Sequence, residues 1–170
     1  MACNFVTGYA IDCRDSAGGI KNLYIAQWSD VSSVTESSGV VTAISMNGGK
    51  KFWEYQMEKE NCSVTEKENS SVENGTTFYE QEVKFTIKKL TAAQRNNMRI
   101  MVQNRLMVIV KDANDNMWLL GRNFGLDKTG DNTASTGKAF GDLNGFSITL
   151  MGKDNQPMYS STQAIASITV

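Results

Sequence analysis

The fold is decided by residues 77–89, TFYEQEVKFTIKK, because their side chains alternate between apolar and polar. Successive side chains of a β-strand point to opposite faces, so this alternation predicts a strand with one buried face and one wet face. The predicted buried face carries Tyr79, Val83, Phe85 and Ile87, and the predicted wet face carries Glu80, Glu82, Lys84, Thr86 and Lys88. Further strands are predicted at residues 23–28, 40–46, 106–110 and 146–150, of which 106–110 is a continuous apolar run typical of a central strand.

The alternation stops at Thr91, where a helical pattern begins. Thr91 and Gln94 have the spacing of a capping box, in which each side chain bonds a free amide of the first helical turn. The sequence therefore predicts a single helix over about residues 91–104, inside a mainly β chain. The predicted apolar face of this helix carries Met98, Met101 and Val102.

The domain organisation is simple. No linker and no internal repeat interrupts residues 1–170, so we expect a single β domain. Residues 153–170 hold the only proline, Pro157, and form a candidate extended C-terminal arm. We expect neither a signal peptide nor a membrane span, because no segment approaches 18 apolar residues.

Composition argues against several functional classes. Histidine is absent, which excludes Ser-His-Asp and Cys-His catalysis and removes the commonest metal ligand. The three cysteines show no CxxC spacing, so neither a disulfide framework nor a zinc site is predicted. The net charge of -1 and the pI near 5.5 argue against a dedicated nucleic-acid binder. We therefore expect no catalytic, metal or cofactor site and no enzymatic activity.

Two stretches resemble ligand-binding loops without matching them. Residues 112–116 open like a calcium loop, but Met117 and Asn123 stand where that loop requires Gly and Glu. Residues 130–138 resemble a phosphate loop, but the spacing between Gly130 and Gly137 is too long and Ala139 replaces the Ser or Thr. We therefore favour a plain turn at residues 112–116 and a flexible loop at residues 130–138.

Acidic side chains are concentrated in residues 58–82, and basic side chains in the neighbouring residues 83–111. One interpretation is that the two sets of charges lie side by side and neutralise each other. A second is a head-to-tail assembly in which the acidic edge of one copy meets the basic edge of the next. A third places the basic segment on nucleic acid, against which the acidic segment argues. Residues 58–82 hold seven acids (Glu58, Glu60, Glu66, Glu68, Glu73, Glu80, Glu82) and two bases (Lys59, Lys67), and residues 83–111 hold seven bases (Lys84, Lys88, Lys89, Arg95, Arg99, Arg105, Lys111) and no acid.

The order of these features resembles structural proteins of tailed bacterial viruses that infect Bacteroidetes, including the crAss-like phages. The resemblance covers nearly the whole chain as far as Lys153 and depends on the combined order of its motifs. These are the residues 13–21 before 23–25, then Phe78-Tyr79-Glu80-Gln81, the helix, the run 106–110, Trp118-Leu119-Leu120-Gly121, Ala139-Phe140-Gly141-Asp142 and Gly145-Phe146.

What the resemblance implies is a tail-tube-like subunit, with a β-sandwich or partly open barrel flanked by one helix. Such subunits usually form six-fold rings around a channel for DNA, in stacked tubes or as single rings of short tails. The implied partners are copies of the same chain, other tail proteins above and below the ring, and double-stranded DNA in transit. The implied location is the virion tail, assembled in the bacterial host cytoplasm.

The candidate subunit-interface or lumen face combines the wet face of the predicted strand with the basic side of the predicted helix. A conduit should not retain DNA, so we expect the bases of residues 83–111 to face neighbouring subunits or the exterior. A lectin-like, ligand-binding β-sandwich is the alternative function, and an enzyme with a carboxylate site ranks last. The candidate residues are Glu80, Glu82, Lys84, Lys88, Arg95 and Arg99.

Overall fold

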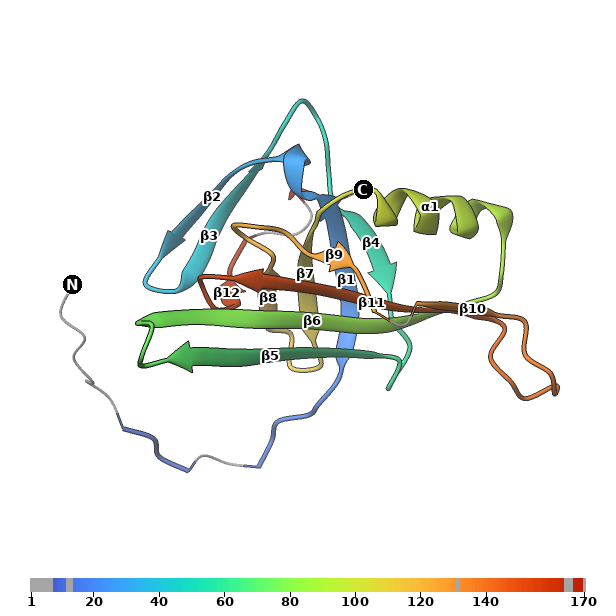
Figure 1. The fold of residues 1–170 in the computed structure, drawn as a ribbon, viewed down its shortest axis with the longest axis horizontal. Coiled ribbons are helices and arrows are strands. Elements are labelled where there is room, and N and C mark those ends of the chain that lie inside the picture. The colour runs from blue at the N-terminus through green and yellow to red at the C-terminus, as the bar shows by residue number, and fades with distance from the viewer. Residues whose placement is uncertain (1–7, 12–13, 131, 164–166, 170) are drawn as a thin grey trace.

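The computed structural model describes residues 8–11, 14–130, 132–163 and 167–169, and its two β-sheets cross at a steep angle (Figure 1). The first sheet has seven strands in the order β2 (Val31–Ser37), β3 (Val40–Met46), β12 (Tyr159–Ser161), β8 (Met117–Leu120), β7 (Leu106–Asp112), β1 (Ile20–Gln27) and β4 (Trp53–Gln56). The second runs β10 (Thr133–Ser135), β11 (Gly145–Asp154), β6 (Thr76–Lys88) and β5 (Cys62–Ser71), with β9 (Asp127–Lys128) also paired to β11. The 3-10 turn η1 (Trp28–Asp30) and the helix α1 (Ala92–Val102) complete the fold. The prediction of a mainly β chain with one helix is confirmed for the described residues, and the sheets form a β-sandwich-like fold without a closed barrel.

Strand β6 has the predicted two faces. Val83 and Phe85 are buried between the sheets, whereas Lys84 and Lys88 are exposed on the other side. The strand is hydrogen-bonded to β11 on one side and to β5 on the other, which makes it an inner strand of the second sheet. The inner faces of both sheets meet in one apolar cluster that includes Leu23, Val108, Val83, Phe85, Ile148 and Leu150.

A second apolar cluster lies on the opposite face of the first sheet. Strand β7 contributes Val108 and Val110 to the first cluster, and Met107 and Ile109 to the second. Both faces of β7 are therefore buried, which explains its continuous apolar sequence and confirms the predicted central strand. Each fully buried side chain of this kind contributes about 1.5–3 kcal/mol relative to its exposed state.

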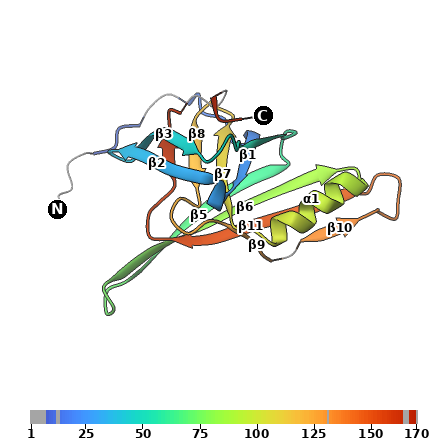
Figure 2. The same cartoon turned by 90° about the horizontal axis from the view of Figure 1, so that it is seen from above.

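Helix α1 connects β6 of the second sheet to β7 of the first and covers one open side of the sandwich (Figures 1 and 2). Met98 and Met101 are buried in the cluster between the sheets, as predicted. Val102 is 59% exposed, so its predicted place on the packed face is wrong. It belongs to the last helical turn and lines a surface groove instead.

The helix begins and ends close to the predicted positions. The Thr91 hydroxyl accepts a hydrogen bond from the Gln94 amide at 3.2 Å, as one half of the predicted capping box. The reciprocal half is missing: Oε1 of Gln94 is buried and has no partner among the described residues. The helix ends at Val102, because Gln103 is the C-cap residue, rather than at Asn104.

Buried polar side chains join the two sheets. Gln81 is only 2% exposed, and its Oε1 accepts from the Gly121 amide at 2.9 Å while its Nε2 donates to Glu66 Oε2 at 3.1 Å. Asp154, also buried, accepts from the backbone and side-chain nitrogens of Asn123, each at 2.9 Å. Since buried polar groups need partners, this network fixes how the sheets are stacked.

The described residues of the candidate C-terminal arm are built into the fold. Strand β12 lies between β3 and β8, parallel to β3 and antiparallel to β8. Ile168 is buried in the second cluster, and Thr169 pairs with Phe52. Residues 164–166 and 170 lie outside the described part of the chain. No helix in the described part is long and apolar enough to cross a membrane.

Candidate functional site

The six candidate residues fall into two groups. Glu80, Glu82, Lys84 and Lys88 all lie on the outer face of β6, as the alternation predicts. Arg95 and Arg99 lie on α1 and line a groove beside it. The structure therefore brings the first four together and the last two together, on different elements.

The outer face of β6 has paired charges. Lys84 Nζ lies 2.7 Å from Glu82 Oε1, and Lys153 of β11 lies 3.1 Å from Glu80 Oε1. Lys88 forms an ion pair with Glu58. The hydrogen bond from Lys153 lowers the pKa of Glu80. On this face the structure favours the interpretation in which neighbouring charges neutralise each other, although exposed ion pairs of this kind contribute little stability.

Of the remaining bases of the segment, Lys111 is neutralised by Asp115, whereas the other four are not neutralised in this way. Arg95, Arg99, Lys89 and Arg105 form no ion pair with any described carboxylate. Their unpaired charges are concentrated on and around α1, because that helix and its flanks hold no acid.

A groove of about 630 Å³ lies between α1 and the strands β10 and β11. We name it the helix groove. Its apolar surface is made by Met98 and Val102 of the helix and by Phe146 and Ile148 of β11, and its charged surface by Arg95, Arg99 and Lys128. None of the described residues that line it is a carboxylate.

Lys128 shows that this groove is electropositive. Its Nζ donates to the backbone carbonyl of Met98 at 3.4 Å, which holds the ammonium under the helix. Burial lowers the pKa of Lys128, and the positive charge of Arg95 lowers it further. An acidic group entering the groove would therefore relieve the repulsion between the two bases.

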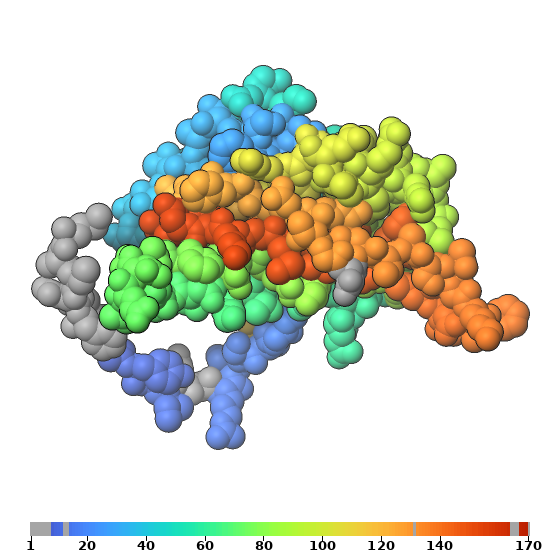
Figure 3. Space-filling model, in the orientation of Figure 1, coloured from blue at the N-terminus to red at the C-terminus, as the bar shows by residue number. Residues whose placement is uncertain are grey.

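Three segments project from the body of the molecule and carry exposed apolar side chains (Figures 2 and 3). Val72, at the tip of the β5–β6 hairpin, is 99% exposed. Phe140, in the loop 136–144 between β10 and β11, is fully exposed. Tyr9 and Ile11, in the segment before β1, are almost as exposed. Nothing in the described part of the chain covers these side chains.

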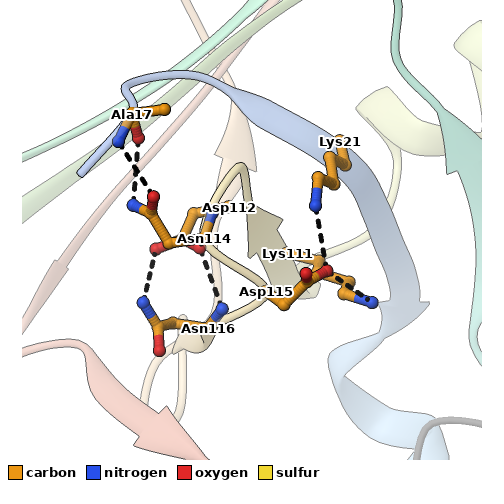
Figure 4. Close-up of polar contacts among 7 residues, drawn as sticks. All are labelled: Ala17, Lys21, Lys111, Asp112, Asn114, Asp115 and Asn116. Carbon is orange, nitrogen blue, oxygen red and sulfur yellow. Dashed lines mark hydrogen bonds and ion pairs between the residues drawn. The ribbon is translucent and has the colours of Figure 1, made fainter. Parts of the chain in front are cut away.

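The turn at 112–116 anchors the segment before β1 (Figure 4). Asn114 accepts from the Ala17 amide through Oδ1 and donates to the Ala17 carbonyl through Nδ2, both at 2.9 Å. Asp115 lies 3.0 Å from Lys21 and 3.1 Å from Lys111. The sequence did not reveal this role of Asn114, since its partner is far away in the chain.

The same contacts occupy the oxygens that a calcium loop would need. Asp112 Oδ1 accepts the amides of Asn114 and Asn116 at 2.8 Å, and its Oδ2 accepts from the side chains of Asn116 and Trp118. Asp115 is held by two lysines. Within the described residues no three potential metal ligands of the His, Cys, Asp and Glu type come together.

At the end of the stretch that resembles a phosphate loop, two backbone amides also have a hydrogen-bond partner nearby in the chain. Asp142 Oδ2 accepts the amides of Lys138 and Ala139 at 2.9 and 2.8 Å. These two bonds lower the pKa of Asp142, the Ala139 bond more strongly. The amides that could have contacted a phosphate therefore bind a carboxylate of the same loop.

A second groove of about 630 Å³ lies on the other side of α1, along β1 and the edge strand β4. Trp53 is 62% exposed there. Ile100 and Tyr55 add apolar surface, and Asp30, Lys50 and Asn97 add polar groups. The alternation of Trp53 and Tyr55 with Glu54 and Gln56 favours a buried tryptophan, but Trp53 lies on an edge strand and is exposed in this groove, whereas Tyr55 is partly buried.

Comparison with protein-family models, with curated proteins and with solved structures found no match to this chain. What the chain does must therefore be inferred from its own residues and their geometry.

Proposed function

We propose that this chain is a non-enzymatic structural subunit that assembles with copies of itself. The observation that carries the proposal is the display of apolar side chains on three segments that project from a well-packed body. Val72, Phe140 and Tyr9 would each contribute about 1.5–3 kcal/mol if an interface covered them. These side chains are exposed on the single subunit and would be covered where a neighbouring copy contacts the projections.

More specifically, the subunit forms a ring in the tail of a tailed phage. In the family that the chain resembles, such rings usually have six-fold symmetry. The resemblance described above supports this, as does a sandwich-like fold with open sheet edges at β5, β2 and β4. Edges of this kind invite pairing with another chain, and closure into a ring removes them. The partners of the ring are further tail proteins on either side of it.

The outer face of β6 is compatible with DNA passing nearby. Lys84 and Lys88 each contact a carboxylate, so neither presents an isolated positive charge to phosphates. Since phosphate contacts accumulate over the copies of a ring, a balanced face retains DNA far less than a basic one. Arg95 and Arg99 belong at a contact between copies or on the exterior.

Native mass tests the proposal. The purified protein is examined by multi-angle light scattering from micromolar to near-millimolar concentration, and by negative-stain electron microscopy. Rings or short tubes with a central hole are the expected result. A mass of 18.7 kDa at every concentration would refute self-assembly, and closed particles without a hole would refute the ring.

The groove at Trp53 supports an alternative, a ligand-binding, lectin-like module without catalysis. An exposed tryptophan flanked by Asp30, Lys50 and Asn97 can stack on a sugar ring while polar groups bind its hydroxyls. A panel of glycans, screened by quenching of tryptophan fluorescence, separates the two functions. Saturable binding that Trp53→Ala abolishes, in a protein that stays monomeric, would favour this alternative.

A further inference from the structure

One end of strand β6 projects as an isolated two-stranded ribbon. Strand β11 accompanies β6 only as far as the pair Tyr79–Asp154, whereas β5 and β6 remain paired to Ser71–Thr76. Residues 68–78, which we name the acidic ribbon, therefore have no third strand beside them. Two-stranded ribbons are only marginally stable alone, so this one gains most from a neighbouring molecule.

The acidic ribbon has the chemistry of an insertion element. It holds two acids, Glu68 and Glu73, and no base, and both acids are exposed. At its tip the exposed Val72 precedes Glu73, and the Asn74 amide donates to Ser71 Oγ at 3.3 Å. Because the turn is already ordered, little conformational entropy is lost when it binds.

The helix groove has the complementary chemistry. It offers an apolar surface, including the exposed side of Val102, beside Arg95, Arg99 and Lys128. Three positive charges without a described acid are matched by a segment with two negative charges and no positive one. Partly buried charges of this kind gain more from an opposite charge than exposed ones do.

The two surfaces cannot meet within one molecule. The acidic ribbon is at the beginning of β6, and α1 follows the end of the same strand (Figure 2). A strand of 13 residues extends for about 40 Å, so the two features lie at opposite ends of the subunit. A contact between them must join two copies head to tail, and such heterologous contacts close into rings or grow into filaments.

We propose that the acidic ribbon of one copy docks in the helix groove of the next, with Val72 on the apolar surface and Glu73 and Glu68 beside Arg95, Arg99 and Lys128. The proposal depends on the proposed function, since it names the contact through which the subunits assemble. It also explains the charge division between residues 58–82 and 83–111. The charges on the outer face of β6 are paired within one molecule, whereas the charges of the acidic ribbon and of the helix groove pair between neighbouring copies.

Mixed-chain cross-linking tests the contact. In chains with Cys3→Ser and Cys13→Ser, Val72→Cys is mixed with Val102→Cys and the mixture is oxidised. We expect a disulfide-linked dimer in the mixture and little in either chain alone. The matched control pairs Val72→Cys with Glu60→Cys, because Glu60 is exposed and belongs to neither surface.

Charge reversal tests the electrostatic part. Arg95→Glu with Arg99→Glu should raise the apparent Kd of association by about tenfold or more, and so should Glu68→Lys with Glu73→Lys. Mixing the two doubly reversed chains should restore association between them. The controls Lys59→Glu and Glu60→Lys change exposed charges outside both surfaces and should alter the apparent Kd by less than about twofold.

The outcomes separate the contact from assembly itself. If the wild-type chain assembles but cross-linking stays at the control level and charge reversal has no effect, the contact is wrong and self-assembly stands. If the wild-type chain is monomeric throughout, both proposals fail. If Arg95→Glu with Arg99→Glu assembles normally but loses binding to a short DNA duplex, the groove serves nucleic acid and the contact is overturned.

Discussion

Replacement of Gln81 by methionine should lower the free energy of unfolding far more than the same replacement at an exposed position of a strand. Methionine keeps the volume of the side chain but removes every hydrogen bond that it makes. The Gly121 amide would be left buried without an acceptor, and Glu66 and the Gln156 carbonyl would each lose one donor. A buried donor left unpaired costs about 1–3 kcal/mol.

The expected loss in the free energy of unfolding depends on which hydrogen bonds the partners of Gln81 keep in the variant. Glu66 Oε2 keeps the bond from the Met158 amide, and the bond to Gln156, at 3.4 Å, is long. We therefore assign most of the loss to the Gly121 amide and the rest to Glu66, for a decrease of about 2–4 kcal/mol in the free energy of unfolding. At this chain length each 1 kcal/mol corresponds to a fall in Tm of about 2–4 °C.

Urea unfolding followed by tryptophan fluorescence and circular dichroism measures the effect, at a protein concentration where the chain is monomeric. The control is Gln56→Met, the same chemical change at an exposed position of β4, which should cost less than about 0.5 kcal/mol. Equal losses for the two variants would refute the role given to the buried network.

Three further predictions concern the helix cap, the segment before β1 and the buried thiol. Thr91→Ala should cost about 1 kcal/mol in urea unfolding while Thr91→Ser costs little, because serine keeps the hydroxyl that accepts the amide; equal costs would contradict the cap. Asn114→Ala should accelerate tryptic cleavage after Arg14 several-fold and leave cleavage after Lys138 unchanged, whereas equal acceleration at both sites would indicate general unfolding. Burial raises the pKa of the Cys62 thiol to about 12, so with the other two cysteines replaced by serine the folded chain should react with a thiol reagent at pH 8 only as fast as it unfolds. Immediate reaction would contradict that burial.

The predictable parts of the fold are those in which one segment carries its own signal. Alternation over residues 77–89 is enough to predict both faces of β6, and the apolar run 106–110 is enough to predict a strand buried on both sides. The change of period at Thr91 locates the helix. In each case the hydrophobic effect acts on a periodic pattern, so local sequence decides the structure.

The parts that could not be predicted depend on distant partners. Strand β12 has three residues without a pattern and gains its place only from β3 and β8. The helix groove joins side chains from α1, β9 and β11, and no window of the sequence contains them all. Charge alone groups Arg95 and Arg99 with the bases of β6, but their separation from its outer face depends on how the helix packs.

Strand β12 also determines when the first sheet can be completed. Among the strands of the described residues, β12 is the one that pairs the hairpin of β2 and β3 with the rest of that sheet, although the hairpin comes more than a hundred residues earlier in the chain. During synthesis at about 5–20 residues per second, the hairpin therefore leaves the ribosome well before the strand that attaches it. Until residues 159–161 emerge, the exposed edges of β3 and β8 are both open to pairing with another nascent chain. A polysome translates many copies side by side. The pairing of β12 with β3 and β8 is therefore the folding step at which neighbouring nascent chains would exchange strands instead of folding correctly.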